Sequence, residues 1–279
     1  MKRMAPSERS PAAAAAPRAL VERYRPQDLA VFTPEERRRF LGPIDPRLLS
    51  LVDEDPEAWR TVAPKVAWEL LYRIEPDLYD RLIAGEHLHP GILGWLPAAI
   101  DRAVDVGAGL GRFTASIASR CVELAAIEPA GPLRSRLKSR MDALGHHQVS
   151  VRPGFFDALP LPDGWADLTV SCSAFMCTPE HGGDAGLAEM ERVTADGGCV
   201  VIVWPPRNQA WLAERGFGFV EFPGEMQVEF SSVDEALEIA AIFYPRAVAA
   251  IEAMGARHVP YEILGINPPC SLAWRRVAR

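Results

Sequence analysis

The chain has 279 residues, of which 48% are hydrophobic and 24% are charged, and its formal net charge is −7 at pH 7. This composition is typical of a globular protein with one large α/β domain and an appendage, and the acidic balance argues against nucleic acid as a partner. Apolar runs are too short to span a bilayer, so no membrane partner is expected. Five cysteines without a C-x-x-C pair give no signal for disulfides or zinc and favour the cytoplasm.

The first hundred residues divide into a tail and a helical region. Residues 1–25 are rich in Ala, Pro, Arg and Ser and offer little to bury, which predicts a disordered tail. Apolar side chains recur at helical spacing in residues 56–74, and the segment 76–85 opens with proline and closes with glycine. We therefore expect a helical N-terminal cap over residues 26–100.

From residue 101 onward, short apolar segments alternate with amphipathic helices. The predicted strands are AVDV (103–106), VELAAIE (122–128), VSVRP (149–153), ADLTVS (166–171), GCVVIVW (198–204), HVPYEILG (258–265) and SLAWRRVA (271–278). Such alternation indicates βαβ units and a mostly parallel sheet, whereas the short connection between the last two strands favours an antiparallel pair. The expected fold is an α/β, Rossmann-like seven-stranded sheet with an antiparallel last strand. It occupies residues 101–279, with an insertion at about 205–253 that contains a helix at about 234–253.

Three alternating glycines follow the first strand directly, in VDVGAGLGRF at residues 104–113. Gly107 and Gly109 allow the backbone to approach a ligand closely, and Gly111 allows the next helix to begin close to the strand. The free N–H groups at the start of that helix suit an anionic group. A dinucleotide fingerprint requires a third glycine where this chain has Arg112, so the pattern disfavours an NAD site.

Acidic residues stand at the ends of three successive predicted strands, namely Asp105, Glu128 and Asp157. Because the carboxyl ends of parallel strands meet at one edge of a sheet, these side chains are expected to face one ligand. Glu128 can accept hydrogen bonds from both hydroxyls of a ribose. Asp157 can accept one from an adenine amino group while Phe156 lies along the base. Each acid alone could be a turn or surface residue, but the ordered set favours a nucleoside.

Four blocks resemble, in order and spacing, the class I S-adenosylmethionine-dependent methyltransferases, with a domain similar to methyltransferase type 11. The blocks are VDVGAGLGRFT, AIEPA, FFDALPLPDGWADLTVS and LAEMERVTADGGCVVIV, within residues 100–205. The resemblance implies an enzyme that uses S-adenosylmethionine as cofactor. It implies methyl transfer to an oxygen or nitrogen of a small-molecule acceptor in secondary metabolism, by a monomer or homodimer.

The resemblance also implies a set of cofactor-binding residues near the strand ends. They are Asp105, Gly107, Gly109, Gly111, Glu128, Phe156, Asp157, Ala158 and Ser171. Within this set, Asp105 and the Gly107 backbone would hold the methionine ammonium end and Glu128 the ribose diol. Asp157 and the Ala158 N–H would hold the adenine.

The acceptor side carries weaker signals. A histidine near neutrality can accept a proton, and His87, His89 and His181 are the candidate catalytic residues. Each could instead be a helix cap, a surface residue or part of a glycine-rich loop, and His87 with His89 lacks a third ligand for a metal. Residues 56–100 are expected to form a lid, with Tyr79, His87 and His89 nearest the acceptor. Two alternatives stay open: an NAD-dependent oxidoreductase and a non-catalytic partner subunit that keeps the cofactor fold.

Overall fold

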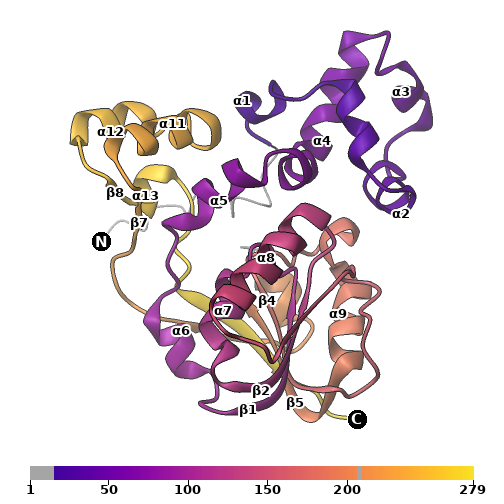
Figure 1. The fold of residues 1–279 in the computed structure, drawn as a ribbon, viewed down its shortest axis with the longest axis vertical. Coiled ribbons are helices and arrows are strands. Elements are labelled where there is room, and N and C mark those ends of the chain that lie inside the picture. Colours follow the sequence, from indigo (N-terminus) through magenta and orange to yellow (C-terminus); the bar gives the residue numbers. More distant parts are fainter. Residues whose placement is uncertain (1–15, 206–208) are drawn as a thin grey trace. The chain divides into compact units, whose positions relative to one another are not determined.

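The computed structural model describes residues 16–205 and 209–279 (Figure 1). The chain divides into two compact units, and each is built from separate stretches of sequence. The helical unit comprises the residues up to Glu86 together with 227–267, and the sheet unit comprises 87–226 together with 268–279. None of the helices in the described ranges combines the length and the apolar character needed to cross a membrane.

The sheet unit is built on a seven-stranded sheet with the order β3-β2-β1-β4-β5-β9-β6. Its strands are β1 (Ile100–Val106), β2 (Cys121–Ile127), β3 (Val149–Arg152), β4 (Ala166–Cys172), β5 (Thr194–Val203), β6 (Gly218–Glu221) and β9 (Ser271–Arg276). Strands β1 to β5 pair in parallel, whereas β9 runs antiparallel to both of its neighbours, β5 and β6. The mostly parallel, Rossmann-like sheet with an antiparallel last strand is confirmed.

Helices cover both faces of this sheet (Figure 1). They are α6 (Pro90–Trp95), α7 (Arg112–Ala118), α8 (Gly131–Ala143), α9 (Gly183–Val193) and α10 (Gln209–Ala213), with a short 3-10 helix, η4 (Pro179–His181). On one face, Met190 of α9 packs in a buried cluster with Val104 and Val200. On the other, Leu137 of α8 packs with Ala126. Fully burying a side chain of this size stabilises the fold by about 1.5–3 kcal/mol, which fixes the helices to the strands.

The seventh strand is not the segment that the sequence pattern suggested. HVPYEILG contributes only β8 (His258–Pro260), which pairs antiparallel with β7 (Gln227–Glu229) in a separate two-stranded sheet of the helical unit. Pro260 occupies the N-cap position of the short helix α13 (Tyr261–Leu264), and its missing N–H disfavours a continued strand ladder. Besides β5, β9 pairs instead with β6, which lies inside the expected insertion.

The helical unit contains the two helices expected in residues 56–85. Its helices are α1 (Arg18–Val21), η2 (Pro26–Val31), α2 (Pro34–Glu36), η3 (Arg37–Leu41), α3 (Pro46–Leu51), α4 (Pro56–Ile74), α5 (Pro76–Ala84), α11 (Val233–Phe243), α12 (Val248–Met254) and α13. Asp55 caps α4 by accepting a hydrogen bond from the Glu57 N–H at 2.8 Å. The single helix expected at 234–253 is interrupted after Phe243, because Pro245 disfavours helical geometry at Tyr244.

The tail and the domain boundaries differ from the sequence-based expectation. Residues 1–15 lie outside the described residues, but residues 16–25 are ordered. Leu20 and Tyr24 are buried, and the Tyr24 hydroxyl donates to Glu75 at 3.0 Å. The compact units also divide the expected cap at Glu86 rather than at residue 100, and they assign 227–267 to the helical unit. Composition alone gave no sign that these two distant segments share one core.

Candidate cofactor site

The glycine turn after β1 has a backbone that other residues tolerate poorly. Gly107, Gly109 and Gly111 have φ values of +73°, +55° and +81°, in the left-handed region that favours glycine. A Cβ at Gly107 would lie 2.6 Å from the Ala174 Cβ, and one at Gly111 would lie 2.2 Å from the Leu137 Cδ1. The turn therefore holds bare backbone at the carboxyl edge of the sheet and lets α7 start directly against α8.

Glu128, the residue that follows β2, is held against this turn by two backbone amides. Its Oε2 accepts from the Gly109 N–H at 2.9 Å, and its Oε1 accepts from the Ala130 N–H at 2.8 Å, while the residue is only 5% exposed. The carboxylate is therefore fixed in place at the glycine turn, and a carboxylate is a suitable acceptor for ligand hydroxyls.

Asp105 lies inside β1 with no exposed surface. Its Oδ2 accepts from the Thr114 hydroxyl at 2.6 Å, whereas its Oδ1 is buried without a hydrogen-bond partner in the described part of the chain. Burial raises the pKa of this carboxyl to about 6, against the opposing effects of the Thr114 bonds and the Arg112 charge. An ionised Asp105 therefore lacks compensation that a nearby ligand cation would supply.

Phe156 and Asp157 follow β3 and reach the same edge. The Phe156 Cζ lies 3.3 Å from the position that a Gly107 Cβ would occupy, and its ring meets Phe175 edge-to-face at 5.5 Å. Asp157 is exposed beside it. The Ala158 N–H donates to the Phe155 carbonyl at 3.1 Å, so in this structure that amide closes a local turn.

Ser171 does not converge with Asp105. Its hydroxyl is fully buried within β4 and has no hydrogen-bond partner among the residues described. Side chains alternate along a strand, so Ser171 shares the face of Thr169, whose hydroxyl lies 2.7 Å from that of Thr194. Asp105 bonds to Thr114 of α7 on the opposite face. The assignment of Ser171 to the cofactor site remains a prediction without support from this geometry.

The three candidate catalytic histidines occupy different settings. His87 is exposed, and His181 is half-buried at the end of η4, in the loop after β4. His89 caps α6, because its Nδ1 accepts from the Gly91 N–H at 3.0 Å, and its ring stacks on Phe222 at 5.6 Å. A neutral histidine whose Nδ1 accepts a hydrogen bond carries its proton on Nε2, so His89 presents a donor rather than a base.

Two residues that the sequence analysis did not select mark the same edge of the sheet. Ser173 follows β4 and Trp204 follows β5, and their φ values are +61° and +54°. They are the only non-glycine residues with positive φ in the described ranges. Such backbone strain concentrates at functional sites. Arg112, at the start of α7, lies over the Trp204 ring at 5.8 Å. In the sequence, the large Trp204 side chain directly after a central strand is the feature that could have marked this position.

A metal centre has no support in the described ranges, where no three His, Cys, Asp or Glu side chains are grouped to hold an ion. The residues present do fit a nucleoside cofactor with a cationic end. The glycine turn places bare backbone at the carboxyl edge of the sheet, two backbone amides fix the Glu128 carboxylate, and Asp105 has a buried oxygen that lacks a hydrogen-bond partner among the described residues. Tyr79, expected near the acceptor, belongs to the helical unit and packs on Tyr72 at 4.8 Å. The lid over residues 56–100 stays a prediction.

The sheet order defines a Rossmann-like domain with acidic residues at the carboxyl edge of its strands. Residues 103–198 match the family described as a methyltransferase domain, an enzyme family that uses S-adenosylmethionine. The match covers β1 to the middle of β5, which includes the glycine turn, Glu128 and Asp157.

Curated relatives are similar to this chain over part of its length. A Mycobacterium tuberculosis protein described as an uncharacterized methyltransferase is 29% identical over 132 residues, which are 46% of this chain and 50% of the relative. A Mycobacterium bovis protein of the same description gives the same values. The chain thus spans about half the length of the curated relatives it matches.

Solved structures show a similar fold. One chain of the complex between the Haloferax volcanii Trm112 methyltransferase activator and a methyltransferase has a TM-score of 0.50 and 14% identity, covering 74% of this chain and 95% of its own. A SAM-dependent methyltransferase of Aquifex aeolicus has a TM-score of 0.40 and 17% identity, covering 57% and 86%.

Proposed function

We propose that the chain transfers a methyl group from S-adenosylmethionine to an oxygen or nitrogen atom of a small molecule. The observation that carries the proposal is the pair of buried carboxylates at the ends of β1 and β2. Glu128 is positioned by two backbone amides, and one Asp105 oxygen has no hydrogen-bond partner in the part of the chain that the structure describes. One carboxylate suits a diol and the other suits a cation, and S-adenosylmethionine contains both groups.

In this proposal the protein binds and orients, while the cofactor supplies an electrophilic methyl group on its sulfonium. Glu128 accepts from the ribose hydroxyls, and the charge of Asp105 stands opposite the ammonium end. Phe156 lies along the adenine, with Asp157 beside it. Holding the acceptor in line with the methyl group supplies most of the rate enhancement, because the displacement itself needs few chemical groups.

Removal of a proton from the acceptor requires a base. The hydrogen bonds of the three histidines indicate which of them can act as one. His181 and His87 remain candidates. His89 accepts from the Gly91 N–H and is better suited to holding α6. We expect His181→Ala or His87→Ala to lower turnover while the affinity for S-adenosylhomocysteine stays unchanged. His147→Ala, at an exposed turn residue, is the matched control.

Calorimetric titration with S-adenosylhomocysteine tests the cofactor assignment. We expect a micromolar dissociation constant, on the order of −8 kcal/mol, and no heat with NADH. Tight binding of NADH with none of S-adenosylhomocysteine would establish the oxidoreductase alternative. Binding without transfer of labelled methyl to any member of an alcohol, phenol and amine panel would support the non-catalytic alternative. A role in secondary metabolism stays a prediction until an acceptor is identified.

A further inference from the structure

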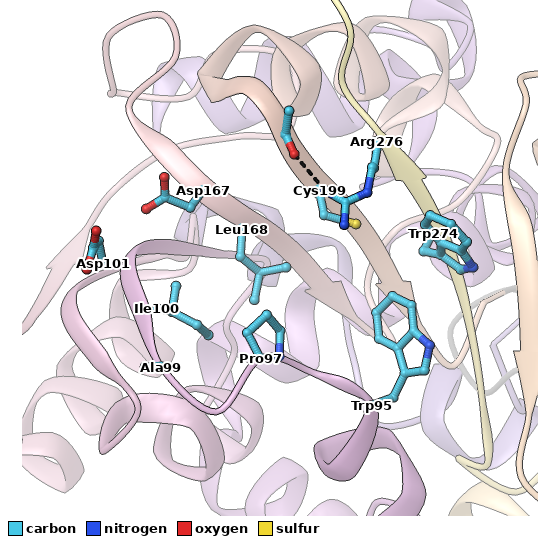
Figure 2. Close-up of a pocket in the computed structure, with 11 residues that line it drawn as sticks. Trp95, Pro97, Ala99, Ile100, Asp101, Asp167, Leu168, Cys199, Trp274 and Arg276 are labelled. Carbon is cyan, nitrogen blue, oxygen red and sulfur yellow. Dashed lines mark hydrogen bonds between the residues drawn. The ribbon is translucent and has the colours of Figure 1, made fainter.

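A cavity of about 580 Å³ opens in the sheet unit at the edge opposite the glycine turn (Figure 2). Its lining includes Ile100 near the start of β1 and Leu168 near the start of β4. It also includes Arg276 at the end of β9. Ile100 and Asp105 are five residues apart in β1, a separation of about 17 Å along a strand. The cavity is therefore distinct from the candidate cofactor site.

One end of the cavity is aromatic. Trp95 of α6 and Trp274 of β9 are half-buried, with ring centroids 5.7 Å apart and planes at 51°. The buried side chains of Ile100 and Leu168 lie between these indoles and the opposite end (Figure 2). Indole and aliphatic surfaces of this kind, in a cavity within the usual 300–1,000 Å³ of small-molecule sites, favour an apolar ring.

The other end of the cavity is acidic. Figure 2 shows the carboxylates of Asp101 and Asp167 on the side of the cavity away from the indoles. Both residues are exposed, and the Asp167 Oδ2 accepts from the Arg102 N–H at 2.9 Å, which fixes its orientation. These carboxylates make this end attractive to a cation.

Arg276 and Cys199 lie between the two ends. The Arg276 guanidinium donates to the Gly197 carbonyl at 3.0 Å, the dashed bond in Figure 2. Burial raises the pKa of the Cys199 thiol, so it stays neutral near pH 7. The charged side chains of the lining are therefore two carboxylates and one guanidinium, and the balance is negative.

We propose that this cavity is a second binding site, separate from the cofactor site, for a small amphipathic amine. The ring of the ligand lies on Trp95 and Trp274, and its protonated amine lies between Asp101 and Asp167. Each part of the ligand meets the end of the cavity with the matching chemistry, and Arg276 disfavours a second cationic group between them.

Tryptamine is a suitable probe, with indole-3-propionate as the comparator that keeps the ring and reverses the charge. Each is titrated calorimetrically into the full chain, with and without saturating S-adenosylhomocysteine. We expect one saturable site for tryptamine at submillimolar concentration under both conditions, and binding of indole-3-propionate at least tenfold weaker. Equal affinity for the two probes, or no binding of tryptamine up to millimolar concentration, would overturn the proposal.

Variants assign the binding to this cavity. We expect Trp274→Ala, and separately the Asp101→Asn/Asp167→Asn double variant, to weaken tryptamine at least tenfold. Arg276→Gln should tighten it about twofold, because a like charge is removed. The matched controls are Trp59→Ala in the helical unit and Glu123→Gln on the exposed side of β2, which should stay within twofold.

Using two kinds of variant keeps the test decisive even if one variant misfolds. The two aspartates are exposed, so their amide replacements keep the fold and decide the question even if Trp274→Ala unfolds the sheet unit. Unchanged tryptamine affinity in the aspartate double variant would place the bound probe elsewhere, for example at the acceptor site, and would refute the proposal.

Discussion

Glu36 in the helical unit and Asp105 in the sheet unit are both buried carboxylates, but their surroundings differ. The Glu36 Oε1 accepts from Arg73 Nε at 3.1 Å and Nη2 at 2.8 Å, and its Oε2 accepts from the Thr33 N–H at 2.8 Å. Arg73 also donates to Glu69 at 2.6 Å and lies over the Phe32 ring at 5.0 Å. Every charge in this cluster has a partner of the opposite sign.

The pKa values of the two carboxyls shift in opposite directions. For Glu36, burial raises the pKa, but the hydrogen bonds from Arg73 and Thr33 outweigh it, and the pKa falls below its usual value. For Asp105, burial dominates and raises the pKa to about 6. Burial of an acid therefore does not by itself indicate function. A buried acid whose charge is left uncompensated is the better indicator of a ligand site.

The largest expected effect comes from breaking the compensated cluster. Arg73→Met removes the guanidinium that is bonded to both Glu36 and Glu69 and should lower the free energy of unfolding by about 3–5 kcal/mol, as measured by urea denaturation. Arg60→Met is the control, because the Arg60–Glu57 pair is exposed and contributes little. A loss below 1 kcal/mol would mean that the buried network does not hold the helical unit together.

The next effect concerns Asp105 and pH. Its pKa is about 6 in the folded chain against an ordinary value of 3.8, so between these values the folded state binds the extra proton. Stability should therefore fall as pH rises from 4 to 7, by up to about 3 kcal/mol. Asp105→Asn should remove this loss and Glu123→Gln should keep it in the same titration. Equal slopes for wild type and Asp105→Asn would remove the contrast with Glu36.

Glu128 is an intermediate case, since two backbone amides donate hydrogen bonds to its buried carboxylate. Glu128→Gln replaces one acceptor by a donor and should weaken S-adenosylhomocysteine binding by about 1.5–3 kcal/mol in calorimetry. Glu189→Gln is a matched control, because Glu189 also accepts from a backbone N–H, that of Leu159 at 2.9 Å, but on α9. If both variants bind alike, the role of Glu128 is confined to shaping the turn.

The smallest expected effect is the pH dependence of ligand affinity. If Asp105 faces the ammonium group, it must lose its proton before it attracts the cation, so S-adenosylhomocysteine should bind up to about tenfold more weakly at pH 5 than at pH 7.5. Titrations at both pH values measure this ratio. In Asp105→Asn the ratio should shrink toward one, and an unchanged ratio would attribute the dependence to another group.

Much of the sheet unit could be predicted from the sequence because its signals are local. The alternation of strands and helices, the glycines after β1, the acid at the end of β1 and the acids after β2 and β3 depend on a few neighbouring residues each. The assignment of β6 and β8 failed because it depends on which strand the chain pairs with after a long excursion. Short strands carry little of that information.

The positions of the candidate site residues in the fold were predictable to a similar degree, while their roles stay predictions. Asp105, Glu128 and Phe156 lie where their strand positions required. The capping role of His89 depends on a hydrogen bond to Gly91, and the local use of the Ala158 N–H depends on a turn. The aromatic cavity joins residues from α6, β1, β4, β5 and β9, and no single segment of the sequence signals it.

The position of β9 in the sheet has a consequence for biosynthesis. β9 pairs with both β5 and β6, yet it is made about 50 residues after β6. Until the ribosome has released it, β5 and β6 each present an unpaired edge, and such edges invite pairing with other chains. The segment 227–267, which completes the helical unit, emerges during this interval. We therefore expect slow translation between β6 and β9 to increase aggregation of the nascent chain, and faster translation or a holding chaperone to reduce it.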